Sequence, residues 1–271
     1  MRLKITHTTT YRYDSPDHYA LQQLRMTPKT GEGQVVRNWQ TQVTGGRVQT
    51  SFTDHHMNHV QLMVVDAGAT EVAVTCTGEV DTADRAGVVG RERSFAPLWL
   101  FTAPTPMTQP GPALRKLVVR MKPGAAEPAL AHLHRLSAEI GAAMRFDPAA
   151  TVVTTTAEAA LAAGHGVCQD HTHVFLAAAR LLGVPARYVS GYLRMDGIED
   201  QDATHAWAEA WVEPLGWIGF DVANALSPDA RYVRVATGRD YAEAAPIRGL
   251  RQGGGNETLT VSLKVQDQTA Q

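Results

Sequence analysis

The first 85 residues alternate apolar and polar positions in the way that is typical of β-strands. Gly45-Gly46 lies between two of the runs and is a hairpin signal, and Gly68 is a turn between two Val-rich runs. Short strands at this spacing predict an antiparallel β-module, either a sandwich or a barrel. The candidate strands are residues 2–13, 34–44, 47–53, 59–66 and 70–80.

The pattern then changes to helical spacing. Residues 127–144 carry apolar side chains at intervals of three and four, which predicts an amphipathic helix. Thr155-Thr-Ala-Glu158 is a capping box, which predicts the start of a short helix. Residues 168–182 are apolar almost all round, so we expect a buried helix that ends at Gly183.

Strands return in the last third of the chain. Residues 186–193 form one, and residues 204–213 alternate strictly between apolar and larger or polar side chains. The turn at residues 214–216 sends residues 217–221 back beside them, which predicts a hairpin. Residues 257–265 alternate once more, as a last strand.

These elements predict an α+β chain in three parts. The segment between the two larger parts holds five prolines and shows no clear period, so we interpret it as a linker that packs on the surface. The expected parts are an N-terminal antiparallel β-domain over residues 1–85, a proline-rich linker over residues 86–112 and an α+β core over residues 113–271.

Composition excludes several classes of protein. The net charge of −2 shows no basic excess for nucleic acid, and no apolar stretch is long enough for a membrane span. The start of the chain lacks the apolar region of a signal peptide. The two cysteines, Cys76 and Cys168, do not make a disulfide framework, so we expect a reduced, cytoplasmic protein.

Cys168 is a candidate nucleophile. It follows Gly164-His-Gly-Val, where glycines allow a tight turn and a close approach of substrate, and it opens the predicted buried helix. The free amide groups and the dipole at a helix N-terminus favour the thiolate, which is the form that attacks a carbonyl carbon. The Cys168 amide is one candidate oxyanion donor, and the sequence does not identify a second.

A base and a carboxylate accompany the cysteine. His205 lies near the start of the strictly alternating strand, and Asp221 ends the strand predicted to pair with it. Antiparallel pairing around the turn at residues 214–216 brings the two side chains together. Singly, each residue is more often structural, but nucleophile, base and carboxylate together predict a catalytic triad.

Two histidine clusters offer other interpretations. His165, His171 and His173 lie close to Cys168 and suggest zinc, but their spacing on one helix converges poorly, so we expect no metal and no cofactor. We expect His171 or His173 to line the cleft or to satisfy the core. The second cluster, in residues 54–59, is interpreted as a polar turn between strands.

Several motifs resemble the core of the transglutaminase-like superfamily, and in particular the bacterial transglutaminase-like cysteine peptidases. The β region around Tyr11-Arg-Tyr13 is similar to the N-terminal region of that subgroup. The core motifs are Gly166-Val-Cys-Gln-Asp170, Gly183-Val-Pro-Ala-Arg-Tyr-Val-Ser-Gly-Tyr192, His205-Ala-Trp-Ala-Glu209, Gly216-Trp-Ile-Gly-Phe-Asp221 and the run from Asp229 to Asp240. One departure is Asp221-Val-Ala-Asn224, where the family usually has Asp-Pro-Thr.

The resemblance implies a papain-like core, with a central Cys-bearing helix packed on an antiparallel sheet. It implies Cys168 as nucleophile, His205 as general base and then acid, and Asp221 as the residue that orients the imidazole. The substrate it implies is a peptide or protein, and it suggests a functional link to ATP-grasp peptide-ligase-like proteins.

Three functions remain open at this point. The first is hydrolysis of a peptide, isopeptide or side-chain amide through a thioester, the second is transamidation of glutamine by an amine, and the third is a silent binding scaffold. No tryptophan lies between Trp99 and Trp207, so the upstream tryptophan that resemblance to the cross-linking enzymes would imply has no clear counterpart. We therefore expect hydrolysis.

Overall fold

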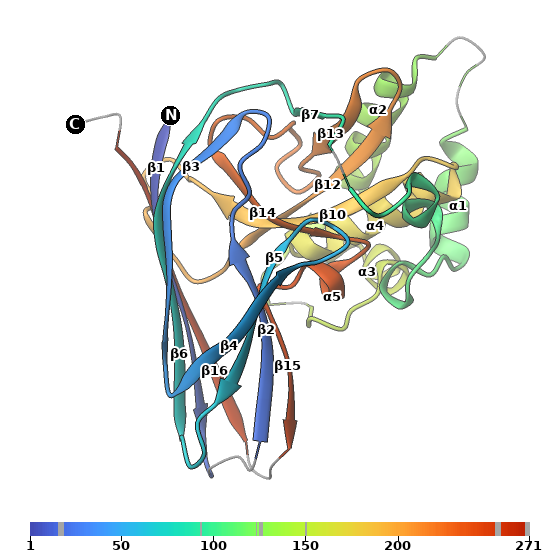
Figure 1. The fold of residues 1–271 in the computed structure, drawn as a ribbon. Helices are drawn as coiled ribbons and strands as arrows, with labels where there is room; N and C mark the ends of the chain where they lie inside the picture. Colours follow the sequence, from blue (N-terminus) through green and yellow to red (C-terminus); the bar gives the residue numbers. More distant parts are fainter. Residues whose placement is uncertain are drawn as a thin grey trace.

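The molecule has two parts that lie side by side, a β-sandwich and an α+β core (Figure 1). The structure is a computed structural model, and it describes residues 1–268 except for 16–18, 93, 123, 125–126, 150 and 253–255. No helix in these described ranges is long and apolar enough to cross a membrane. The mixed α+β architecture with antiparallel sheets is confirmed.

The sandwich consists of two antiparallel sheets, with strand orders β11-β16-β1-β6-β3 and β15-β2-β5-β4. Its core lies between them, where Leu24 and Met63 of one sheet pack with Val74 and Cys76 of the other. The strands are β1 (Arg2–Tyr13), β2 (Tyr19–Thr27), β3 (Gln34–Thr44), β4 (Gly46–Thr53), β5 (His59–Val65), β6 (Glu71–Thr82), β11 (Asp200–Gln201), β15 (Ile247–Gln252) and β16 (Glu257–Asp267).

The hairpin expected at Gly45-Gly46 is wrong, although its strands exist, whereas the turn expected at Gly68 is present. β3 pairs with β6 and β4 pairs with β5, so the chain crosses from one sheet to the other at Gly45. Gly45 has a φ of 73°, and a Cβ atom there would lie 2.1 Å from the Glu71 carbonyl oxygen. The glycines serve a tight crossing between sheets, a geometry that short sequence patterns do not distinguish from a hairpin.

The C-terminal strands belong to the sandwich and not to the α+β core in which we expected them. We grouped residues 257–265 with the core, but β16 pairs with β1 from Leu3↔Asp267 to Tyr13↔Glu257. β15 pairs in the same way with β2. The physical reason is that alternation predicts a strand and its two faces but carries no information about a partner more than 200 residues away.

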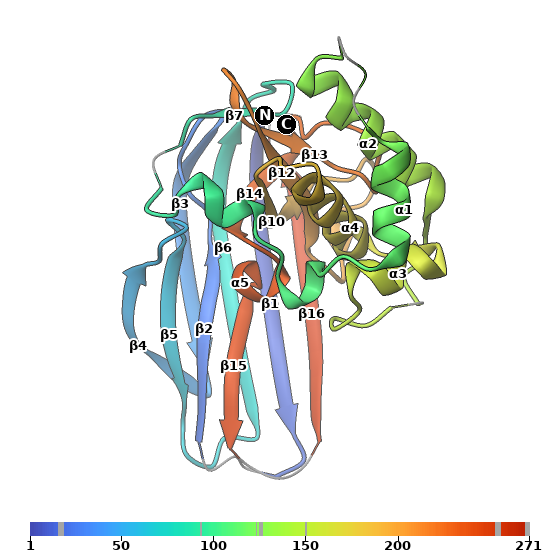
Figure 2. The same cartoon turned by 90° about the vertical axis from the view of Figure 1, so that its right-hand side faces the viewer.

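The core has one antiparallel sheet, in the order β14-β10-β12-β13-β7, with helices packed on one of its faces (Figure 2). A short parallel pair, β8 and β9, precedes the central helix. The strands are β7 (Val88–Gly90), β8 (Arg145–Phe146), β9 (His165–Gly166), β10 (Ala186–Leu193), β12 (His205–Val212), β13 (Gly216–Phe220) and β14 (Tyr232–Gly238). The helices are α1 (Pro112–Arg120), α2 (Ala129–Ala143), α3 (Ala157–Ala163), α4 (Cys168–Leu181) and α5 (Tyr241–Ala244).

Helix α4 is the centre of the core, as its apolar sequence predicts. Its residues Val174 to Ala179 are buried against α1, α2, α3 and the sheet. The alternation of β12 is confirmed, because its alanines face this helical cluster while Trp207 belongs to a separate cluster with Tyr232.

The proline-rich segment is folded onto the core. Its strand β7 forms the edge of the core sheet, and it also contains the 3₁₀ helices η1 (Leu98–Thr102) and η2 (Pro106–Thr108). The buried Arg180 guanidinium holds this segment by donating to the Phe101 carbonyl at 3.0 Å and to the Thr108 hydroxyl at 2.8 Å. A cation buried with this many acceptors fixes the segment in one place.

The predicted capping box has different contacts from those expected. Thr156 caps α3 by accepting from the Ala159 amide at 3.3 Å. Glu158 points instead at the N-terminus of α1 and accepts from the amides of Gly111, Ala113 and Leu114 at 3.0, 2.7 and 3.1 Å. One carboxylate therefore joins α3 to α1, two helices that are far apart in the sequence.

Candidate active site

Cys168 is the first residue of α4, half-buried at the edge of a cleft. The turn before it is held by the buried Asp170 carboxylate, which accepts from the Val167 amide at 2.8 Å and from the Thr151 hydroxyl at 2.7 Å. A Cβ atom at Gly166 would lie 2.6 Å from the Asp170 side chain, so only glycine fits there. Asp170 thus fixes the backbone that presents the thiol, at a helix end where a carboxylate is favoured.

His205 and Asp221 meet through the predicted hairpin. β12 pairs with β13 from Ala208↔Phe220 to Val212↔Gly216, which sets the start of β12 beside the residue after β13. The distance between His205 Nε2 and Asp221 Oδ2 is 2.6 Å. Burial lowers the pKa of His205, but hydrogen bonds with Asp221 and Cys168 outweigh it and raise the pKa to about 10. His205 is therefore protonated at neutral pH when it faces a thiolate.

Asp221 is fully buried and accepts hydrogen bonds from other residues besides His205. Asn224 Nδ2 donates to Asp221 Oδ2 at 2.8 Å, and the Tyr232 hydroxyl donates to the same oxygen at 2.7 Å. Burial raises the pKa of Asp221, but these bonds and His205 bring it below its usual range. The carboxylate stays ionised beside the imidazole.

Tyr232 and Asn224 are residues whose part in this site the sequence reasoning missed. Asn224 entered the sequence analysis only as part of the departure from the family pattern after Asp221. Tyr232 lies on β14, which is separated from β12 by β10, so no local spacing connects it to Asp221.

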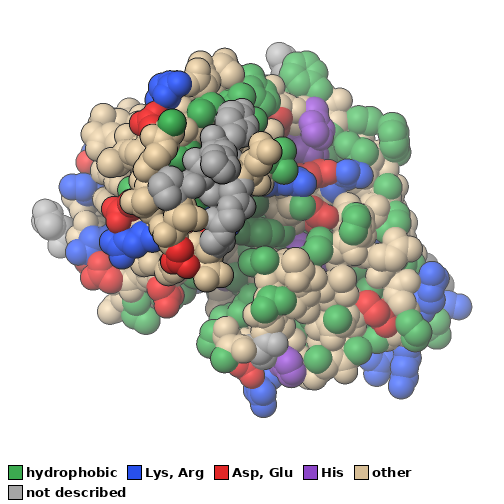
Figure 3. Space-filling model, turned by 90° about the horizontal axis from the view of Figure 1, so that it is seen from below, with side chains coloured by type: hydrophobic (Ala, Val, Ile, Leu, Met, Phe, Trp, Pro, Cys, Tyr) green, Lys and Arg blue, Asp and Glu red, His purple; other side chains and the backbone are tan. Residues whose placement is uncertain are grey.

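A cleft of about 600 Å³ opens beside Cys168 and His205. Its lining includes Phe146, Pro148, Met195, Ile198 and the chain before β12. Figure 3 shows the surface hollowed between the two parts of the molecule. A cleft of this size, with apolar walls and a few polar groups, is typical of a small-molecule or peptide site.

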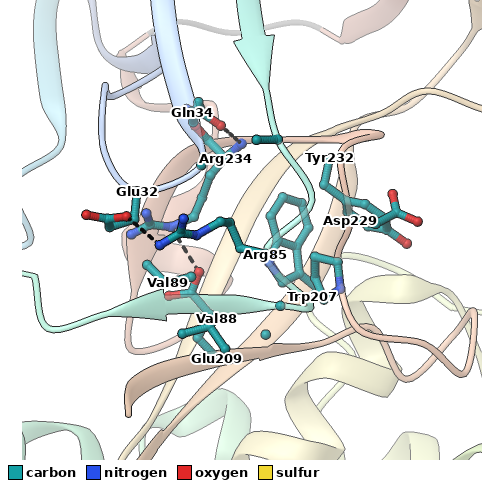
Figure 4. A pocket seen from close by; sticks show the side chains of 15 residues that line it. Glu32, Gln34, Arg85, Val88, Val89, Trp207, Glu209, Asp229, Tyr232 and Arg234 are labelled. Atoms are coloured by element: carbon teal, nitrogen blue, oxygen red, sulfur yellow. Dashed lines mark hydrogen bonds and ion pairs between the residues drawn. The ribbon is translucent and has the colours of Figure 1, made fainter. Parts of the chain in front are cut away.

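The face of β12 that points away from the helices carries Trp207 and Glu209. These two residues line a second, much smaller cavity of about 60 Å³ (Figure 4). Trp207 and Tyr232 stand there edge to face, with ring centroids 5.3 Å apart. The Trp207 ring also stacks on His205, with centroids 6.2 Å apart. Aromatic packing from behind therefore restrains both the imidazole and the tyrosine that holds Asp221.

Next to this cavity lies a buried group of two arginines and two glutamates. Glu209 bridges Arg187 and Arg234, with nitrogen–oxygen distances of 2.6 and 2.9 Å. Glu92 also contacts both arginines, each at 2.6 Å. Buried charges are tolerated when each is paired in this way, and the group connects the linker to three strands of the core sheet.

Two of the histidines near Cys168, His171 and His173, are held in the core by hydrogen bonds. His171 Nδ1 lies 2.9 Å from the Val167 carbonyl oxygen, and His171 Nε2 lies 3.3 Å from that of Met144. His173 Nε2 accepts from the Tyr241 amide at 3.1 Å, and burial lowers the pKa of His173 to about 3, so the ring is neutral. Because these nitrogens are already occupied, the two rings satisfy the core.

The second histidine cluster is a turn, as expected, but it also anchors the sandwich to the core. His56 Nε2 lies 2.9 Å from Glu243 Oε2, and Asn58 exchanges hydrogen bonds with the Thr237 backbone. The ligand atoms of His55, His56 and Glu243 lie within 4.8 Å of one another. Arg239 already holds the Glu243 carboxylate, with a nitrogen–oxygen distance of 2.7 Å, so the set fits an anchor better than a cation site.

The comparisons with known proteins agree with this fold. Residues 115–222 match the transglutaminase-like superfamily, and residues 3–81 match the bacterial transglutaminase-like N-terminal region. The chain is 29% identical to an uncharacterized protein of Mycobacterium leprae, covering 97% of this chain and 98% of that one. It is 37% identical to part of an uncharacterized protein of Mycobacterium tuberculosis, covering 49% of this chain and 46% of that one.

A solved structure has a similar fold. It is that of a "putative cysteine protease" from Cytophaga hutchinsonii, with a TM-score of 0.77, 23% identity, and coverage of 98% of this chain and 90% of that one. At this identity the likeness shows the fold. The two family matches along the chain place its core in the transglutaminase-like superfamily, with a bacterial transglutaminase-like N-terminal region in front of that core.

Proposed function

We propose that the protein is a cysteine-dependent hydrolase of peptide, isopeptide or side-chain amide bonds. The observation that carries this proposal is the position of His205. Its Nε2 lies 2.6 Å from the buried Asp221 carboxylate, while the ring also contacts Cys168 at the edge of the cleft. Nucleophile, base and orienting carboxylate in contact are the requirement for acyl transfer.

In the first half of the reaction the Cys168 thiolate attacks the amide carbonyl carbon. A carbon–sulfur bond forms, and the carbonyl oxygen becomes an oxyanion that the Cys168 amide at the α4 N-terminus can stabilise. The His205 imidazolium then gives its proton to the nitrogen, the carbon–nitrogen bond breaks and the amine leaves. A thioester remains on Cys168.

In the second half His205 is neutral and acts as the base. It takes a proton from water, the hydroxide attacks the thioester carbon, and the carbon–sulfur bond breaks. The acid leaves, Cys168 is again a thiolate and His205 an imidazolium. The ionised Asp221 stabilises the imidazolium in both halves of the cycle.

Two observations favour water over an amine as the acceptor. No tryptophan is among the described residues that line the cleft. Trp207 packs behind His205 and Trp217 packs against Phe101 and Arg187, so neither walls an acceptor channel. A transamidase must exclude water from its thioester, and the described residues around this cleft supply no tryptophan wall for that purpose.

The experiment is a peptide-amide substrate incubated with a millimolar primary amine, with products identified by mass. We expect free acid and amine from the native protein and neither from Cys168→Ala. A product that is mainly the amine adduct would replace hydrolysis by transamidation. No product from any amide, together with slow alkylation of Cys168, would favour the silent scaffold.

A further inference from the structure

A second chamber of about 190 Å³ adjoins the catalytic cleft, and it formed no part of the expectations from the sequence. The chamber lies where β1 and β16 of the sandwich meet the start of β12 and of α5. Four residues line both cavities, namely Asp202, Ala203, Thr204 and Tyr241. Because Thr204 directly precedes His205, the shared wall stands next to the reacting groups.

The chamber is lined by both apolar and polar side chains. The apolar ones include Tyr11, Ile247, Leu259 and Val261. Two of its polar side chains, His7 and Thr9, are buried. His7 Nε2 lies 3.2 Å from the Thr9 hydroxyl, and His7 Nδ1 lies 3.0 Å from the Tyr192 hydroxyl. Burial lowers the pKa of His7 to about 4, so the His7 ring carries no charge at neutral pH.

Apart from the reacting pair Cys168 and His205, the charged residues that line the two cavities are acidic. No lysine or arginine is among the described residues that line either cavity, whereas two aspartates are. Asp200 has a partner, because Lys264 Nζ lies 3.6 Å from it. Asp202 lines both cavities, is exposed, and has no ion pair within the part of the chain that the structure describes. A substrate that brought a carboxylate to this junction would be repelled, and a cationic one attracted.

We propose that this chamber is a subsite for the apolar side chain of a residue close to the scissile bond, in a neutral or basic peptide substrate. Its volume equals that of about six water molecules, enough for one large apolar side chain. The proposal rests on the proposed function, since it names which substrates the same thioester chemistry takes. It also gives the sandwich a direct part in substrate selection, because β1 and β16 supply its walls.

The test compares two substitutions on one strand. Leu259→Trp places a larger side chain on the chamber wall, and Thr260→Trp places the same side chain at the next position, whose side chain points to the other face of β16. Peptide amides are varied one position at a time through apolar, basic and acidic residues, and kcat/KM is measured by mass. Binding of the same peptides to Cys168→Ala gives a readout that does not depend on turnover.

We expect one position of the peptide to prefer apolar residues. Leu259→Trp should lower kcat/KM for the preferred peptide by about tenfold or more, the range that a hydrophobic pocket discriminates, and Thr260→Trp should not. Asp202→Asn should reduce the preference for basic over acidic peptides, whereas Asp196→Asn, in the same loop but outside both cavities, should leave it unchanged.

Two kinds of result would overturn the proposal, and they differ. Hydrolysis with no apolar preference at any position, or equal losses in the two tryptophan variants, would remove the subsite and leave the hydrolase intact. Absence of hydrolysis for every peptide, with Cys168→Ala binding none of them, would remove the proposed function and the subsite together.

Discussion

Asp221 shows how much of this site depends on single contacts. One oxygen, Oδ2, accepts from Asn224 and Tyr232 and contacts His205 Nε2. A buried carboxylate needs several donors to stay ionised, and each added donor also limits where the carboxylate can move. These contacts therefore also restrain the His205 imidazole that Asp221 binds.

Replacing this carboxylate should change both rate and pH dependence. We expect Asp221→Asn to fold, because Asn224 and Tyr232 remain, and to lose up to about 10⁴-fold in kcat, as in serine triads. Asp221 helps raise the pKa of His205 to about 10, so without it that pKa falls. Acylation needs the imidazolium. As pH rises, the variant should therefore lose activity at a lower pH than the native protein does. A pH profile of kcat/KM measures this, and an unmoved alkaline limb would contradict it.

The two cysteines should differ in reactivity. Cys168 is half-buried at a helix N-terminus beside His205, whereas Cys76 is fully buried in β6 and burial raises the pKa of its thiol to about 11. A limiting dose of iodoacetamide at neutral pH should therefore label Cys168 first, because the thiolate is the reactive form. Mass spectrometry of the digested protein reads the ratio, and equal labelling would argue against Cys168 as the nucleophile.

At the scale of elements, helices are joined by side chains from neighbouring helices as well as by apolar packing. Glu158 of α3 accepts from three amides at the start of α1, and Arg180 of α4 binds the segment that holds η1 and η2. These contacts satisfy backbone groups that helix ends leave free. They position α1 and the linker around the helix that carries Cys168.

Glu158 offers a test at this scale. Glu158→Gln keeps the shape but removes the charge at the α1 N-terminus, so we expect a loss of about 1 kcal/mol in the free energy of unfolding. Glu139→Gln, on the exposed face of α2, is the matched control and should change that free energy by less than about 0.5 kcal/mol. Urea unfolding of both variants measures the difference, and equal losses would contradict the cross-helix cap.

At the scale of the whole molecule, polar contacts tie the sandwich to the core. His56 and Asn58 reach α5 and β14 from the turn after β4, and the chain before β12 forms β11 on the edge of β16. The loop that lines the cleft is thus attached to the sandwich. The buried group of Arg187, Glu209, Arg234 and Glu92 lies inside the core beside this junction.

The buried group predicts acid sensitivity. Burial would raise the pKa of Glu92, but Arg234 and Arg187 hold it well below its ordinary value of 4.5. The stability that Glu92 contributes is therefore complete above pH 4.5 and is lost as pH falls through its lower, folded-state pKa. Glu92→Gln should cost about 3–5 kcal/mol at pH 7, because it leaves two buried arginines underpaired.

The pH dependence supplies a second check on this group. Below pH 4.5 the free energy of unfolding should fall less steeply in Glu92→Gln than in the native protein, because one linked carboxylate is gone. Glu32→Gln, which alters an exposed pair with Arg85, is the control and should behave like the native protein. Identical slopes in all three proteins would show that Glu92 is not linked to folding.

The sequence by itself determined the local elements and the hairpin between His205 and Asp221. The alternation over residues 204–213 and the turn at 214–216 are local, and antiparallel pairing around a short turn leaves little freedom of register. The helix that begins at Cys168 is equally local, because its apolar run and its end at Gly183 lie within one segment. These features predicted the positions of all three candidate catalytic residues.

Only the tertiary structure decided which distant strands pair and what surrounds the site. β15 and β16 return to the sandwich, and Tyr232 reaches Asp221 from β14. Glu158 caps a helix more than 40 residues away, in contacts that span 44 to 47 residues. An alternating pattern fixes which side of a strand faces inward, but the choice among distant partners depends on packing the whole chain, and no local pattern encodes it.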